Sequence, residues 1–155
     1  MRQRKLLLAF FLFLAVCSYA QTVYMGNSSF QSDIIYTIRN GYIYRGNSSF
    51  SSDIVCHFDG RVLYKGNSNF SSDILLRYSD GKIYRGNSCF SSDILANYRN
   101  NRLYEGNSSF SSDILVNVRD NKVYKSDSSF SSDILFHSTG HLHPIFIYFI
   151  LISIL

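Results

Sequence analysis

The histidines of this sequence that could hold a metal ion gather near its C-terminal end. His137, His141 and His143 lie close together, and imidazole nitrogens are common ligands of zinc and copper. They fall where a repeated sequence pattern decays, so we interpret them as a chance grouping before an apolar tail. An envelope metal-dependent protein or enzyme that uses this cluster is the alternative hypothesis.

Carboxylates next to serines recur every 20 residues, at Asp33, Asp53, Asp73, Asp93, Asp113 and Asp133. A ring of them could bind a cation, but the segments lack the dense oxygen-ligand spacing of calcium loops. Asp and Ser side chains also bond nearby backbone amides and hold tight loops, which is the interpretation we favour. Nothing resembles the nucleophile elbow of a Ser-His-Asp hydrolase. We therefore predict no catalytic residues, no metal site, no cofactor and no enzymatic activity.

These residues belong to units that align on a tyrosine, at Tyr24, Tyr44, Tyr64, Tyr84, Tyr104 and Tyr124. A fixed period of this length indicates a repeat architecture in which each unit buries its apolar face against its neighbours. Within a unit, residues 34–39 alternate as a strand does, Asn40-Gly41 favours a tight hairpin turn, and residues 42–44 resume the β-rich pattern. In the second unit Asp59-Gly60 comes one residue early, which predicts an altered loop. The sequence thus predicts an all-β array over residues 21–143.

The substitutions between units predict which side chains point inward. When the units are aligned, each repeat position forms a column of equivalent residues, and one column is always isoleucine: Ile34, Ile54, Ile74, Ile94, Ile114 and Ile134. The column two residues later holds Tyr36, Cys56, Leu76, Ala96, Val116 and Phe136. We expect both columns to lie in the core. The column that follows is polar and is expected to face solvent: Thr37, His57, Arg77, Asn97, Asn117 and His137. A lone aromatic in each Ser-rich loop is expected to be a buried anchor in a shared core: Phe30, Phe50, Phe70, Phe90, Phe110 and Phe130.

The N-terminal segment has the layout of a secretory signal peptide. Basic Arg2, Arg4 and Lys5 precede an apolar run over residues 6–16, which is too short to span a bilayer. Small and polar residues follow, and we predict a signal peptide over residues 1–20, cleaved between Ala20 and Gln21. A lipoprotein acylated at Cys17 is a less favoured alternative, because Val16 stands where a small residue is expected.

Cleavage would change the charge and the cysteine count. Residues 1–20 hold three of the 15 Lys and Arg residues and none of the 11 Asp and Glu residues, which leaves a mature net charge of +1. The broad basic face of a nucleic-acid binder is therefore not expected. Cys56 and Cys89 occupy different positions of the repeat, so we predict no designed disulfide.

The apolar tail, residues 144–155, is also too short to span a bilayer unaided. Three interpretations stay open: a tail packed on the repeats, a lipid-anchor attachment signal after Ser138-Thr139-Gly140, and a membrane-peripheral end. Any membrane contact would come through this tail.

The unit "YxGNSxFSSDIL…DGKI" resembles the bacterial beta-flower repeat proteins, whose four-fold and five-fold forms arrange short hairpins as petals around an axis. The resemblance covers residues 22 to about 138. It implies a closed radial all-β fold in an exported protein, and it implies no activity. Six units exceed the expected number, so the weakened last unit, "YKSDSS", either closes the ring or is a partly formed remnant.

Together these observations predict an exported, non-enzymatic repeat protein, located in the periplasm or cell envelope or secreted. We expect a structural or binding module that displays the same loop several times. Multiplicity gives weak sites avidity for a partner that is itself repetitive, such as a glycan or another envelope component. The identity of that partner is left open.

Overall fold

The structure is a computed structural model that describes residues 20–155, so the signal-peptide prediction for residues 1–20 lies almost wholly outside the described residues. The strands are β1 (Gln21–Met25), β2 (Ile34–Arg39), β3 (Tyr42–Arg45), β4 (Ile54–Phe58), β5 (Val62–Lys65), β6 (Ile74–Ser79), β7 (Lys82–Arg85), β8 (Ile94–Arg99), β9 (Arg102–Glu105), β10 (Ile114–Arg119), β11 (Lys122–Lys125) and β12 (Ile134–Ser138). The helices are the short 3-10 turns η1 (Gln31–Asp33), η2 (Ser51–Asp53), η3 (Ser71–Asp73), η4 (Ser91–Asp93), η5 (Ser111–Asp113) and η6 (Ser131–Asp133), and the α-helix α1 (Pro144–Ile154).

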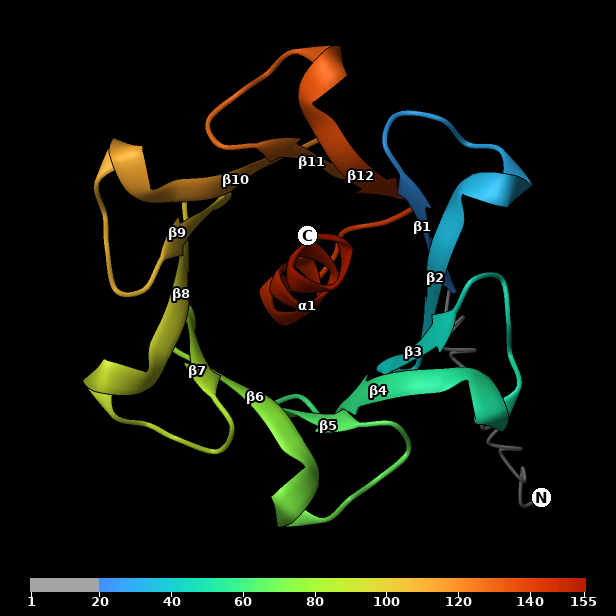
Figure 1. The fold of residues 1–155 in the computed structure, drawn as a ribbon, viewed down its shortest axis with the longest axis horizontal. Helices are drawn as coiled ribbons and strands as arrows, with labels where there is room; N and C mark the ends of the chain where they lie inside the picture. The colour runs from blue at the N-terminus through green and yellow to red at the C-terminus, as the bar shows by residue number, and fades with distance from the viewer. Residues whose placement is uncertain (1–19) are drawn as a thin grey trace, which may run out of the picture.

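The twelve described strands close into one antiparallel barrel in which each strand pairs with its neighbours along the chain. The ring closes where β1 meets β12, with Val23 opposite Ser138 and Met25 opposite Phe136. Figure 1 shows the loops between paired strands projecting outward as petals, and α1 standing inside the ring. The all-β radial prediction is confirmed, and the sixth unit is a full member that closes the ring.

The tight turns between petals follow the predicted Asn-Gly chemistry. Asn40 and Gly41 adopt φ values of 52° and 81°, as the primed hairpin turns require. A Cβ on Gly41 would lie 2.5 Å from the carbonyl oxygen of Phe58, so a larger residue would fit there only if that backbone moved. The altered loop in the second unit is also confirmed: Asp59 Oδ1 accepts hydrogen bonds of 2.8 Å from the backbone N–H groups of both Arg61 and Val62.

A β-bulge in each petal decides which side chains reach the lumen. Ile43 lies opposite Cys56, but the next residue, Tyr44, lies opposite Ile54, so Val55 is an extra residue that breaks the alternation. Five members of the column two residues after each isoleucine are buried as predicted: Cys56, Leu76, Ala96, Val116 and Phe136. The prediction that the isoleucine column is buried is confirmed for Ile94, Ile114 and Ile134. The column does not join the lumen cluster, however, because the bulge places it on the outer wall. There the members range from half-buried to buried, outside the lumen cluster: Ile34, Ile54, Ile74, Ile94, Ile114 and Ile134.

The lumen is filled by the apolar tail. One buried residue of each unit's return strand points into it: Val23, Ile43, Leu63, Ile83, Leu103 and Val123. The same cluster includes Leu142 and five apolar side chains of α1: Ile145, Phe146, Ile147, Ile150 and Leu151. A helix that is apolar all round must be buried, and each such side chain contributes about 1.5–3 kcal/mol relative to exposure. The interpretation of a packed tail is therefore confirmed, with the tail inside the ring. In residues 20–155, no helix has both the length and the apolar character needed to cross a membrane.

Candidate functional site

The petal tips carry the most exposed apolar side chains of the repeat. The prediction that their phenylalanines form a shared core is wrong, because all of them are 71–75% exposed: Phe30, Phe50, Phe70, Phe90, Phe110 and Phe130. The physical reason is that the petal loops project outward from the ring (Figure 1), whereas the apolar lumen is lined by the strands and filled by α1. In the sequence, each phenylalanine is a single aromatic residue among small polar neighbours. This pattern is equally consistent with an exposed residue and with a buried anchor.

The serines and the aspartate of each petal hold the tip in shape. In the second petal Ser48 Oγ donates a 2.5 Å hydrogen bond to Asp53 Oδ2 and accepts one of 3.1 Å from the Phe50 backbone N–H. The Asp53 N–H closes the turn on the Phe50 carbonyl oxygen at 3.0 Å. This arrangement recurs in the third to sixth petals, at Ser68–Asp73, Ser88–Asp93, Ser108–Asp113 and Ser128–Asp133. The loop-capping interpretation of these carboxylates is therefore confirmed for these five petals.

Neighbouring hydroxyls also hold the Asp113 carboxylate in its charged form. In the fifth petal, hydrogen bonds from Ser108 and Ser112 lower the pKa of Asp113 below its usual value. A hydrogen bond to the ionised carboxylate favours that form, so Asp113 carries its charge at neutral pH. The tip thus presents a phenylalanine ring on a loop that its own polar groups fix in place.

The structure does not bring the three candidate histidines together. His137 Nδ1 lies 2.7 Å from the Gly26 carbonyl oxygen, on the outer wall. His143 caps α1 by accepting a 3.3 Å hydrogen bond from the Ile145 N–H, and burial, with His141 as a second cause, lowers its pKa. His141 is exposed. Across the described part of the chain, no three His, Cys, Asp or Glu side chains are grouped so that they could share an ion. The alternative metal hypothesis therefore lacks the geometry that it needs.

The polar column that was expected to face solvent instead joins each petal to the next. Thr37 Oγ1 donates to the Gly46 carbonyl oxygen at 2.8 Å, and Asn117 Nδ2 donates to that of Ser128 at 3.2 Å. His57, Asn97 and His137 reach equivalent carbonyl oxygens. Thr37, His57 and Asn117 are buried. The prediction of a solvent column is wrong, because the loop of the following petal covers this wall.

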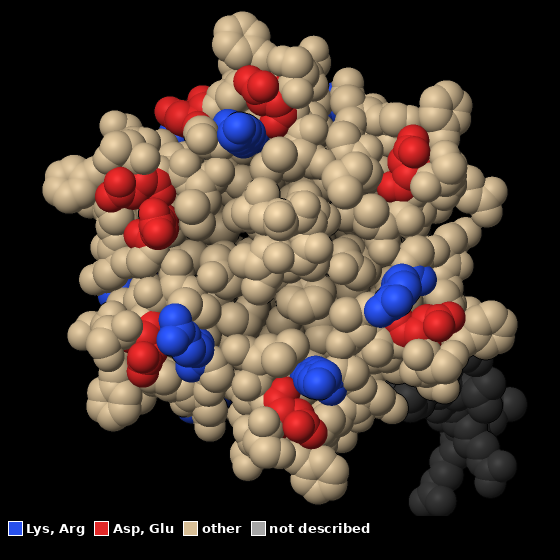
Figure 2. Space-filling view, viewed as in Figure 1, with Lys and Arg blue, Asp and Glu red and all other residues tan. Residues whose placement is uncertain are grey.

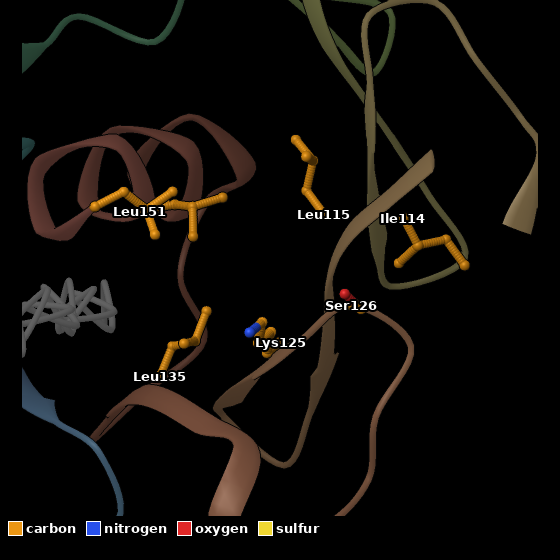
Figure 3. Close-up of a pocket in the computed structure, with 7 residues that line it drawn as sticks. Ile114, Leu115, Lys125, Ser126, Leu135 and Leu151 are labelled. Atoms are coloured by element: carbon orange, nitrogen blue, oxygen red, sulfur yellow. The ribbon is translucent and has the colours of Figure 1, made fainter. Parts of the chain in front are cut away.

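An apolar pocket of about 300 Å³ opens beside the C-terminal end of α1. Figure 3 shows Leu115 and Leu135 directed from the wall toward Leu151 of the helix, with Lys125 beside Leu135. On the face seen in Figure 2, acidic and basic side chains lie next to one another around an uncharged centre. The pocket is therefore a local gap between the helix and the wall.

Comparisons with known proteins agree with this architecture. A family model described as "6-fold beta flower protein" matches residues 16–92 and, in a second alignment, residues 43–144. No curated protein and no solved structure matches the chain. The number of petals corrects the four-fold or five-fold expectation: the six units are the family's own number. With its repeat, its closed ring and this match in agreement, the chain belongs to the 6-fold beta flower protein family.

Proposed function

We propose that this protein is an exported, non-enzymatic module that binds a repetitive partner through its petal tips. The observation that carries the proposal is the set of phenylalanines that are 71–75% exposed, one on each petal of the described ring. A single exposed aromatic needs no explanation. The same exposed aromatic on six equivalent loops, each held by its own hydrogen bonds, favours a repeated contact.

The chemistry of the tips suits the sugar units of an envelope glycan. Each phenylalanine offers a flat apolar face, and exposed Ser and Asn side chains beside it offer hydrogen-bond donors and acceptors, as Asn47, Ser49 and Ser51 do around Phe50. Such a site is small and weak by itself. Several equivalent sites on one rigid ring raise the overall affinity when the partner is also repetitive.

Export is part of the proposal. Ala20 is exposed and directly precedes β1, so cleavage after it leaves every strand of the ring intact. Intact-mass measurement of protein recovered outside the cytoplasm tests this step. A chain that begins at Gln21 is expected, and a retained Met1 would contradict it.

A glycan array tests the binding role. Wild-type protein is compared with Phe70→Ala, with a variant in which all six tip phenylalanines are alanine, and with Arg39→Ala, an exposed control far from the tips. We expect a modest loss for the single change, a loss of more than tenfold for the six-fold change, and no loss for the control. Equal glycan binding by wild type and the six-fold variant, or binding by neither, would refute the proposal.

A further inference from the structure

The third petal departs from the repeat at positions that meet on its outer wall. Val62 stands where four other units carry the longer side chains of Tyr42, Lys82, Arg102 and Lys122. Arg77 stands in the column that otherwise holds Thr, His or Asn. The altered loop at residues 59–61 adjoins both. Together they line a hollow of about 280 Å³, whose walls are Asp59, Arg61, Val62, Tyr64, Ser71, Ile74, Arg77 and Asn87.

Arg77 is incompletely bonded in this hollow. Its Nη1 donates to Asn87 Oδ1 at 3.3 Å, which is longer than a charge-assisted bond to a carboxylate, about 2.7–2.9 Å. Within residues 20–155, Arg77 Nε is the buried side-chain polar atom without a hydrogen-bond partner. A buried donor left unpaired is costly, and the guanidinium fork matches the two oxygens of a carboxylate. The other members of its column bond to backbone carbonyl oxygens instead.

The rest of the hollow combines charge with an apolar floor. Asp59 is fixed by the Arg61 and Val62 N–H groups, and Tyr64 Oη donates to its Oδ2 at 3.4 Å. Desolvation raises the pKa of Asp59, but these hydrogen bonds outweigh it and lower the pKa below its usual value. The ionised Asp59 can accept hydrogen bonds from hydroxyl groups. The half-buried Ile74 supplies the apolar surface, since Val62 is only 5% exposed, and two arginines outweigh the one carboxylate.

We propose that this hollow binds a single acidic sugar unit, a hexuronic acid. Its carboxylate would pair with the terminal nitrogens of Arg77 and with Arg61, its hydroxyl groups would reach Asp59 and Asn87, and its apolar face would lie on Ile74. The volume is at the small end for ligand sites, which suits one monosaccharide. The site lies on the wall and involves no tip phenylalanine, so the inference does not rest on the petal-tip proposal.

The test is an NMR titration of ¹⁵N-labelled protein with galacturonate, neutral galactose and acetate as the three probes. Galacturonate is expected to shift the Arg61, Val62, Arg77 and Asn87 amide resonances saturably, while galactose and acetate leave them almost unchanged. Equal shifts with acetate would show that the site recognises only a free anion. Equal shifts with galactose would show that the site does not recognise the carboxylate. Either result, or the absence of any saturable shift, overturns the inference.

Two variants locate the site. Arg77→Gln is expected to weaken galacturonate binding about tenfold or more, because a charge-assisted pair is lost. Val62→Tyr, which copies Tyr42 of the preceding petal, fills the hollow and is expected to abolish binding while the fold stays intact. Lys82→Gln, at the same position of the next petal, is the matched control and is expected to bind as wild type does. Unchanged binding by folded Val62→Tyr overturns the assignment even where Arg77→Gln fails to fold.

Discussion

Two phenylalanines of the sixth petal, Phe130 and Phe136, occupy opposite environments although they lie close in sequence. Phe130 at the tip is 72% exposed, whereas Phe136 in the lumen is fully buried. The tip residue is phenylalanine in every unit, while the lumen position varies from alanine to phenylalanine. A position that holds the same residue in every unit is therefore not necessarily a core position in this protein. The lumen position holds different apolar side chains that pack around α1, whereas the tip position holds phenylalanine in all units.

The difference follows from a wall that is one strand thick. Apolar side chains on its inner face pack with α1, so burial energy is concentrated in the lumen. The petals on its outer face are held by hydrogen bonds within each loop and to the neighbouring petal. The lumen therefore contributes most of the folding stability. Side chains on the outer face can be exposed without a large loss of stability.

The largest effect is expected from a charge placed in the lumen. Ile147 is fully buried, and Ile147→Asp would put a carboxylate among apolar side chains at a cost of several kcal/mol. That is comparable with the 5–15 kcal/mol that typically stabilises a domain, so we expect no cooperative denaturant transition. Ile152→Asp on the same helix, at a site that is 49% exposed, is the control and should melt nearly as wild type does. Native melts for both variants would contradict the lumen assignment of α1.

A smaller effect separates the two phenylalanines directly. Phe136→Ala removes a fully buried ring and is expected to lower the free energy of unfolding by about 3–5 kcal/mol. Phe130→Ala removes an exposed ring and is expected to change it by about 0.5 kcal/mol or less. Urea denaturation followed by circular dichroism measures both. If the two losses were equal, the tips would take part in the core after all.

The sequence predicted the local structure well because its signals are local. The turn at Asn40-Gly41 and the strand that starts at Ile34 depend on neighbouring residues and appear where expected. The isoleucine column was misplaced because the bulge at Val55 shifts the alternation by one residue, and bulges have no signal of their own in this repeat. Asn117 was misplaced because its partner, Ser128, belongs to the next petal.

The positions of α1 and of the tip rings could not be predicted for a related reason. The apolar composition of the tail indicates that it is buried. Nothing in the tail sequence, however, predicts that the ring is wide enough to hold a helix. The exposure of Phe70 follows from the outward direction of the petal loops (Figure 1), and the loop sequence carries no signal for that direction. The candidate site therefore depends on how the units are arranged around the ring, which a single repeat unit does not reveal.

The smallest effect on stability is expected from modifying the tip cysteine. Cys89 is exposed beside Phe90, whereas Cys56 is buried in the lumen, where desolvation raises its pKa to about 12. The thiolate is the reactive form, so iodoacetamide at pH 8 should alkylate Cys89 and spare Cys56 until the protein is unfolded. Peptide mapping by mass spectrometry identifies the labelled residue, and the midpoint of the denaturant melt should be unchanged after labelling. Alkylation of Cys56 in the folded protein as fast as that of Cys89 would show that the lumen opens to solvent, and the contrast between a sealed interior and an accessible tip would then fail.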